Sequence, residues 1–439
     1  MIYAGLCILG IFLAVMVVWR AISRRGISAI ARDPLVLFSL YFALIHFITP
    51  LAKYWEGIFR YQSQYEVIQY LYTILFSIVF YVFACFWSEY FRRRYGNVAL
   101  GVSARSGAGA MVVGYILCAL GVLFSFKDLS TIQSAVGGVE SFLSDRHSFA
   151  AERGTSRVFS NLLLVGTAVL LAGRLNVSSS KLFVPIYIGV FGFSVFYFNV
   201  LSSRNSVLIL FILNVSVYLF YRLVPPKITK RTLLVSTLVA SSVVGLGVGA
   251  YKITIDRYSV ADSAYMEERR DSAFFYMLDG AFGNDEARLW FLEHGQEYYF
   301  GETYLAAMVN FIPRSMWPEK PLGAGPRLIN QIRPGSYVVG GEGNNSLTTG
   351  LVVEAQMNFG NAGVFVAIVL WAYFANLFIR KASQSPVVLH QVGFLVLAVS
   401  LSTIFIYSEF LGYIVRLGLF LIPVFAFSLV PIRALHLAR

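Results

Sequence analysis

The feature that most constrains this chain is a succession of apolar segments, each close to the length of a membrane span. About twenty mostly apolar residues in a helix cross the hydrocarbon core of a bilayer. By that rule we expect eleven spans, near residues 2–19, 34–52, 67–87, 109–126, 158–173, 182–200, 206–221, 232–250, 362–379, 392–407 and 411–432. Only 13% of the 439 residues are charged, roughly half the fraction found in soluble domains. The sequence therefore predicts an all-α, polytopic integral membrane protein.

The distribution of basic residues among the short loops predicts the orientation. Eighteen of the 35 lysines and arginines fall in one alternating set of loops and the C-terminal tail, whereas the opposite short loops hold only Lys53, Arg60 and Arg204. Cytoplasmic loops are enriched in lysine and arginine. We therefore expect a periplasmic N-terminus and a cytoplasmic C-terminus. The first apolar segment lacks a basic stretch before it and a cleavage site, so we expect it to be retained.

Two longer segments remain on the outer side, residues 127–157 and 251–348. The chain is thus expected to divide into a first bundle at 1–250, a large periplasmic loop at 251–348, and C-terminal spans at 349–439.

The large loop is expected to contain helices of its own. Asn284 can cap a helix over 285–294, and Asp262 can cap another that runs toward residue 278. Farther along, Leu305, Met308 and Val309 form an apolar stripe, which we expect to contact the bundle or the lipid interface.

The outer segments carry many arginines and few lysines. The planar guanidinium group binds two phosphate oxygens at once, which a lysine ammonium group cannot do. We therefore expect a diphosphate-binding cluster formed by Arg146, Arg153, Arg204, Arg288, Arg314, Arg327 and Arg416. Two alternatives stay open: pairing with the acidic residues of the large loop, and, for Arg204, contact with lipid headgroups.

Two charged residues lie in or beside the last predicted span. Arg416 is inside it, and Glu409 precedes Arg416 by two helical turns, on roughly the same face. Ionisable residues within membranes are costly and are functional candidates by default. The alternative is a structural ion pair between Glu409 and Arg416.

Motifs for metals and nucleotides are missing from the sequence. The outer histidines, His147 and His294, have no metal-ligand spacing. The glycines at 323–325 and 340–341 do not lie between a strand and a helix, so we interpret them as loop residues. We expect no metal and no cofactor. The basic residues follow the membrane topology, so nucleic-acid binding is not indicated.

Two neighbouring motifs carry a resemblance to a known family. Residues 312–321 read Ile-Pro-Arg-x-x-Trp-Pro-x-Lys-Pro, and residues 346–363 read Ser-x-Thr-x-Gly-x-x-x-Glu-x-x-x-Asn-Phe-Gly-x-x-Gly. This pattern resembles the O-antigen polymerases of the Wzy type. Outside the two motifs, the resemblance consists of hydropathy and loop order.

The resemblance implies a GT-C-like membrane glycosyltransferase at the outer face of the bacterial inner membrane. Its substrate would be an oligosaccharide on undecaprenyl diphosphate, transferred to the next lipid-linked repeat unit, and a chain-length-regulating co-polymerase would be a partner. We expect the arginines to stabilise the departing diphosphate. A carboxylate would accept the proton of the attacking hydroxyl, with Glu354 the first candidate and Glu409 the second.

Three alternatives to a polymerase stay open. An O-antigen ligase, which transfers the polymer to lipid A-core, would share the number of spans and the large outer loop. A flippase of lipid-linked sugars would show related halves and broken spans, and the sequence has neither. A protein without activity would not need Arg416 within the bilayer.

Overall fold

The structure, a computed structural model, describes residues 2–57, 67–95, 107–136, 158–177, 182–201, 204–221, 282–294, 298–339 and 346–429. Every regular element in these ranges is a helix.

Nine segments in the described ranges are long and apolar enough to cross a membrane. They are α1 (Ile2–Arg25), α3 (Pro34–Ala43) with η1 (Leu44–Ile48) and α4 (Thr49–Glu56), α5 (Val67–Tyr95), α6 (Gly107–Val136), α9 (Leu162–Asn176), α10 (Phe183–Val200), α18 (Gly350–Gln384), α19 (Val388–Ser402) with α20 (Ile404–Tyr407), and α21 (Phe410–Leu429).

The remaining helices are not among these nine segments. They are α2 (Ala29–Arg32), α11 (Arg204–Tyr221), α15 (Asn284–His294), α16 (Glu302–Met308) and α17 (Ala324–Ile332). Of these, α11 is apolar and covers the predicted span at 206–221. The predicted span at 232–250 and the predicted helix at 262–278 lie outside the described residues. At this level the chain is a polytopic membrane protein whose described residues are all-helical.

Two helices differ clearly from their predicted bounds. The helix α6 continues through residues 127–136, which we had assigned to an outer segment, because Asp128 is buried and its carboxylate accepts a hydrogen bond from the Tyr197 hydroxyl at 2.6 Å. The helix α18 begins at residue 350 instead of 362 and is interrupted at Phe359 and Gly360, where Gly360 has a φ of 64°. Glycine adopts this left-handed conformation without steric cost.

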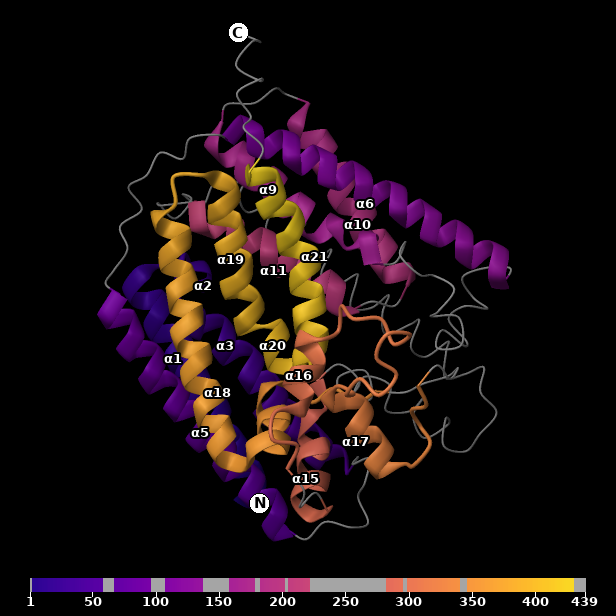
Figure 1. The fold of residues 1–439 in the computed structure, drawn as a ribbon. Helices are drawn as coiled ribbons and strands as arrows, with labels where there is room; N and C mark the ends of the chain where they lie inside the picture. The colour runs from indigo at the N-terminus through magenta and orange to yellow at the C-terminus, as the bar shows by residue number, and fades with distance from the viewer. Residues whose placement is uncertain are drawn as a thin grey trace.

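The two ends of the bundle carry different elements. Figure 1 shows α15 and α17 at the end where α1 begins, whereas α21 ends at the opposite end. The described part of the predicted large loop therefore lies at the end where the chain starts, as the alternation of spans predicts.

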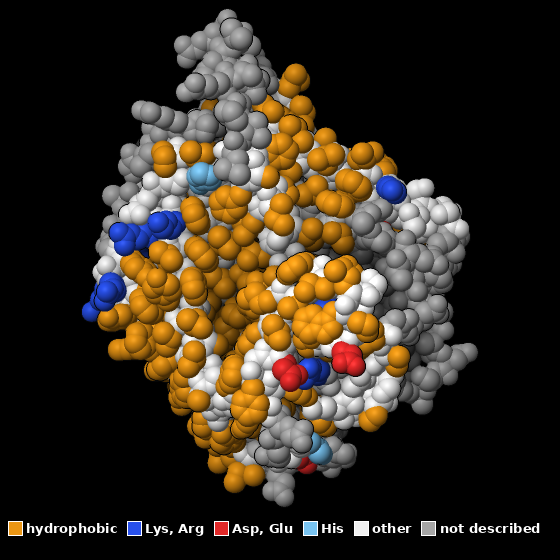
Figure 2. All heavy atoms as spheres, viewed as in Figure 1, with side chains coloured by type: hydrophobic (Ala, Val, Ile, Leu, Met, Phe, Trp, Pro, Cys, Tyr) orange, Lys and Arg blue, Asp and Glu red, His pale blue; other side chains and the backbone are white. Residues whose placement is uncertain are grey.

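The core of the bundle is built around α18 and α19. On α18, the Trp371 ring packs against Phe38 of α3 at 3.9 Å between centroids, and Phe365 packs edge-on against Phe80 of α5 at 5.1 Å. On the outside, hydrophobic side chains cover most of the face formed by α18, α19 and α21, with Lys and Arg side chains at its margins (Figure 2). This apolar surface fits contact with lipid.

Candidate functional site

The second motif, residues 346–363, forms the start of α18 and is held by the large loop. Thr348 donates a hydrogen bond to Asn284 Oδ1 at 2.8 Å, and Asn284 Nδ2 donates to the carbonyl oxygens of Thr349 and Tyr407. Asn284 is the first residue of α15. Its side chain links α15 to the start of α18 and to α20, whereas the sequence predicted only that it caps its own helix. At Gly350, with φ of +65°, a Cβ would lie 2.2 Å from a carbonyl oxygen of α20. These contacts fix the start of α18 against α15 and α20.

Glu354 lies one turn farther along α18 and is almost fully buried, with 1% of its surface exposed. One carboxylate oxygen accepts a hydrogen bond from Thr303 Oγ1 at 2.8 Å, and the other accepts one from the backbone N–H of Phe410 at 2.5 Å. Asn358 Nδ2 donates to the same Thr303 hydroxyl oxygen at 2.7 Å. Glu354 therefore joins α18 to α16 and to the first residue of α21, and protein groups contact both of its oxygens.

Glu409 lies in the turn between α20 and α21, close enough to Glu354 for the two charges to interact. Its Oε2 accepts a hydrogen bond from the backbone N–H of Gly325, at the start of α17, at 2.8 Å. Burial raises the pKa of Glu409 above its usual range, and the Gly325 N–H and the Arg416 charge oppose that rise. A partly buried carboxylate with a raised pKa is suited to accept a proton near neutral pH.

The glycines at 323–325, which we interpreted as loop residues, have a closer role at this carboxylate. A Cβ on Gly323 would lie 2.7 Å from Glu409 Oε2, and a Cβ on Gly325 would lie 2.3 Å from Ser346 Oγ. No larger residue fits at either position without displacing a neighbour. The two glycines are evident in the sequence, but their contact with Glu409 is not, because more than eighty residues separate Gly325 from Glu409.

Arg416 is partly buried on α21. Its Nη1 donates a hydrogen bond to the Tyr407 hydroxyl at 2.8 Å, and its guanidinium carbon lies 6.0 Å from the centre of that ring. Arg416 is near enough to lower the pKa of Glu409. The ion pairs found among the described residues do not include Glu409 with Arg416. Both charges therefore keep hydrogen-bonding capacity for a ligand.

Arg288, a second residue of the predicted diphosphate cluster, is directed into the bundle from α15. Its Nη1 donates to the Thr73 carbonyl at 2.9 Å and to Ser77 Oγ at 2.8 Å, and its Nε donates to Gln356 at 3.2 Å. Burial lowers its pKa to about 10. In this arrangement Arg288 attaches α15 to α5 and α18.

Arg314 and Arg327 contact their own loop. Arg314 Nη1 donates to the carbonyl oxygens of Pro318 and Lys320 at 3.1 and 3.0 Å, which closes the turn formed by the first motif. Arg327 pairs with Glu302 and lies 4.6 Å from the centre of the Tyr299 ring. In this structure Arg327 therefore pairs with an acidic residue of the large loop, which was the alternative to diphosphate binding.

The structure thus brings three of the predicted residues to one junction: Glu354, Glu409 and Arg416. It does not bring Arg288, Arg314 or Arg327 into their hydrogen-bonded network. Arg146 and Arg153 lie outside the described residues, and Arg204 is described only as the first residue of α11.

Two residues of α16 belong to the junction but were not predicted. Thr303 supplies the hydroxyl that bonds Glu354. The Tyr304 ring packs edge-on against Phe410 at 5.3 Å, and burial together with the nearby Glu354 raises the pKa of the Tyr304 hydroxyl. The pattern of the sequence around these two residues resembles that of any short amphipathic helix, so no signal marked them.

No family model, no curated protein and no solved structure matches this chain. Within the described residues, no group of three or more His, Cys, Asp or Glu side chains could hold a metal ion. The chemistry available at the junction is that of a carboxylate beside a guanidinium group.

Proposed function

We propose that this protein is a membrane glycosyltransferase that polymerises oligosaccharide repeat units carried on a prenyl diphosphate. The reaction takes place at the junction of α16, α17, α18 and α21. The observation that carries this proposal is the partly buried pair of Glu409 and Arg416 at the edge of the bundle, each with hydrogen-bonding capacity left over. The second sequence motif, at 346–363, contributes Glu354, which accepts a hydrogen bond from the Phe410 N–H next to Glu409, and the first motif, at 312–321, ends two residues before Gly323.

The two charges have complementary roles in the reaction. The bond between the anomeric carbon and the diphosphate oxygen breaks, and its electron pair leaves with the diphosphate. Arg416 donates hydrogen bonds to the departing oxygens, which stabilises the charge that develops on them. The acceptor hydroxyl oxygen forms the new glycosidic bond, and its proton passes to Glu409. The bond energy is already present in the lipid-linked substrate.

Glu354, our first candidate for the base, has a positioning role in this proposal. Its oxygens already accept hydrogen bonds from Thr303 and Phe410, and its side chain is 1% exposed. An acceptor hydroxyl would have to displace one of these contacts. Glu409 has one carboxylate oxygen outside its bond to Gly325 and is less buried, so it is the better base.

The surface beside the junction supports a lipid-linked substrate. Large apolar side chains are exposed just before α16, along it and in the turn that follows: Phe300, Leu305, Met308, Phe311 and Met316. Of these, Phe311 exposes 83% of its surface. Such residues favour insertion into the membrane interface, which is where the diphosphate group of a prenyl carrier lies. The predicted apolar stripe on α16 is therefore assigned to lipid instead of to the bundle.

The remaining parts of the proposal follow from the substrate. The enzyme acts at the outer face of the bacterial inner membrane, its product is O-antigen or a related surface glycan, and a chain-length-regulating protein is a partner.

Deleting the gene in its host tests this proposal against the other two activities. We expect surface glycan of a single repeat unit, restored to a polymer ladder by the intact gene but not by Glu409→Gln. A bare core, with long chains still attached to the prenyl carrier, would identify a ligase. Single units trapped on the cytoplasmic face would identify a flippase. The control is Arg333→Lys, at an exposed residue directly after α17.

A further inference from the structure

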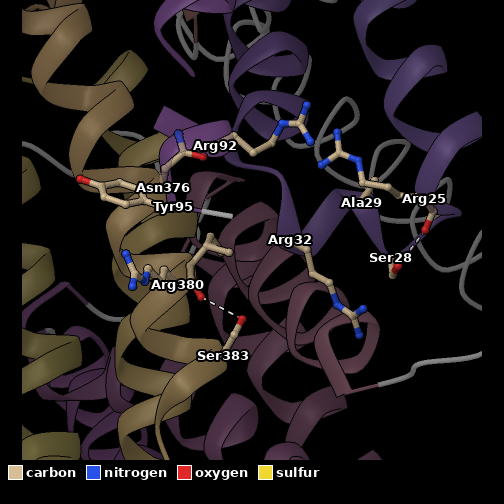
Figure 3. Close-up of a pocket in the computed structure, with 10 residues that line it drawn as sticks. Arg25, Ser28, Ala29, Arg32, Arg92, Tyr95, Asn376, Arg380 and Ser383 are labelled. Atoms are coloured by element: carbon tan, nitrogen blue, oxygen red, sulfur yellow. Dashed lines mark hydrogen bonds between the residues drawn. The ribbon is translucent and has the colours of Figure 1, made fainter. Parts of the chain in front are cut away.

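A second group of arginines lies at the other end of the bundle, away from the junction. A cavity of about 280 Å³ opens between α1, α2, α5 and α18, at the ends of these helices that are remote from α15 and α17 (Figure 1). It is lined by Arg25, Ser28, Ala29, Arg32, Arg92, Tyr95, Asn376, Ile379, Arg380 and Ser383. Figure 3 shows the four arginine side chains around this shared space, one from each helix. We call it the arginine pocket.

Among the described residues, the lining of the arginine pocket has four guanidinium groups and no carboxylate. The acids that pair with two of them, Asp33 with Arg25 and Glu89 with Arg92, are not part of the lining. Glu89 also pairs with Arg93, and Arg380 is in none of the ion pairs found among the described residues. The pocket therefore retains a positive charge that a negatively charged ligand can neutralise.

Two of the arginines contact uncharged groups. Arg32 Nη2 donates a hydrogen bond to the Phe220 carbonyl at 2.8 Å, and burial lowers the pKa of Arg32. The guanidinium carbon of Arg380 lies 5.5 Å from the centre of the Tyr95 ring. This ring contact orients the Arg380 guanidinium group while leaving its N–H donors available.

A hydrophobic surface continues from the arginine pocket along α18 and α5. Tyr95 of the lining packs near Tyr373 at 6.1 Å between centroids, and Tyr373 packs against Phe374 at 5.1 Å. Tyr373 and Phe374 are both exposed, as is Phe86 on α5. A charged pocket that adjoins exposed aromatic residues on membrane-spanning helices has the two parts needed to bind a lipid: one for the headgroup and one for the chains.

We propose that the arginine pocket binds a phosphate-bearing ligand, with the arginines on the phosphate oxygens and the hydroxyl groups of Ser28 and Ser383 beside them. Arginine is the residue best suited to phosphate because its planar fork makes two parallel hydrogen bonds. The phosphate belongs either to the headgroup of an anionic phospholipid or to a soluble phosphate compound. This site is separate from the proposed reaction, so either proposal can fail without the other.

The test uses the full-length protein in phosphatidylcholine nanodiscs. Binding of phosphatidylglycerol is measured by native mass spectrometry, and binding of inorganic diphosphate is measured by calorimetry on the same preparation. We expect at least one of these ligands to bind with an affinity about tenfold or more above that of added phosphatidylcholine or of sulfate, respectively. Retention of phosphatidylglycerol would identify the lipid as the source of the phosphate, and binding of diphosphate alone would identify a soluble compound. Binding of neither ligand above its reference would overturn the proposal.

Matched variants separate the arginine pocket from general surface charge. Arg380→Gln should lose about tenfold or more of the affinity, whereas Arg94→Gln, which removes the same charge from exposed α5 surface outside the pocket, should change it by less than about twofold. Equal losses in both variants would contradict a specific site. If Arg380→Gln does not fold, Ser28→Leu supplies the test, because it fills the pocket and keeps every charge. Full affinity in Ser28→Leu would also contradict the proposal.

Discussion

At the scale of single residues, the surroundings of Glu409 explain why Gly323 and Gly325 lie at the start of α17. Gly325 donates its backbone N–H to the Glu409 carboxylate, and a side chain there would meet both Ser346 Oγ at 2.3 Å and the Leu347 carbonyl oxygen at 2.4 Å. The Leu347 oxygen belongs to the backbone, so the segment that leads into α18 would have to shift to make room.

Gly325→Ala should therefore lower the midpoint of thermal unfolding and reduce polymerisation together. Overpacking of this kind costs about 1–3 kcal/mol. Unfolding of the purified protein in detergent, followed by tryptophan fluorescence, measures the change. The control is Gly189→Ala on α10, where an added Cβ has no neighbour within 4 Å. If neither variant changes the midpoint of thermal unfolding, the first turn of α17 has room for a larger residue and the close contact described here is wrong.

The raised pKa of Glu409 gives a prediction for the pH dependence of the rate. A base must be unprotonated, so kcat/KM should rise with pH through the raised pKa of this group, above the usual carboxyl range. Arg416 lowers the pKa of Glu409. Arg416→Gln should therefore shift the rise of kcat/KM to higher pH and also reduce its maximum value. The measurement is a pH profile of initial rates for both proteins. If the rate rises over the same pH range in both proteins, a group other than Glu409 is titrating.

At the scale of helices, hydropathy predicted where most spans lie but not where they begin. The first turns of α18 contain Glu354, Gln356 and Asn358, which lower the mean hydropathy although all three are buried. Their polar atoms are satisfied by residues far away in sequence, such as Thr303. A pattern based on local composition cannot register such contacts, so the predicted span started twelve residues late.

The same limit applies to the candidate site. The sequence marked Glu354, Glu409 and Arg416 because charges beside or inside apolar segments are unusual. It could not separate these from Arg288 or Arg327, since the partners of those two arginines lie elsewhere in the chain. Charge beside or inside an apolar segment therefore predicted candidates, and hydrogen bonding distinguished them.

The packing of α6 against α9 depends on small residues. A Cβ on Gly114 of α6 would lie 2.6 Å from Leu170 Cα of α9, and one on Gly173 of α9 would lie 2.6 Å from the Met111 backbone nitrogen of α6. Small residues allow two membrane helices to approach closely and to gain dispersion contacts.

Gly114→Val should separate α6 from α9 and lower the amount of folded protein in the membrane. Gly192→Val on α10, where a Cβ meets nothing within 4 Å, is the matched control. The readout is the monodisperse fraction after detergent extraction, measured by size-exclusion chromatography. Equal yields of folded protein from the two variants would contradict the packing described for α6 and α9.

At the scale of the whole molecule, the two clusters of charge lie near opposite ends of the long helix α18. The junction is formed around Glu354 in the first turns of α18, and the arginine pocket is lined by residues 376–383 at its end. The alternation of basic loops predicts that the first of these faces the periplasm and the second faces the cytoplasm.

Cysteine labelling in intact cells tests this orientation. Arg333 and Lys381 are both exposed, the first in the turn after α17 and the second near the end of α18. A membrane-impermeant maleimide should label Arg333→Cys in intact cells, whereas Lys381→Cys should be labelled only after the membrane is opened. The unmodified protein, whose cysteines Cys7 and Cys118 are buried and Cys85 is partly buried, gives the background. The reverse pattern would place the candidate site on the cytoplasmic side.

The central claim, that the junction joins lipid-linked repeat units, is tested most directly with purified protein in liposomes and a synthetic prenyl-diphosphate-linked repeat unit. The products are the polymer ladder and the released prenyl diphosphate, both measured over time. The account predicts one prenyl diphosphate released per bond formed. It also predicts a rate loss of about a hundredfold or more in Arg416→Lys and Glu409→Gln, which corresponds to about 2.7 kcal/mol of transition-state stabilisation. The exposed-site variant Arg333→Lys should keep the full rate. Polymer formation at the full rate in both junction variants would contradict the account.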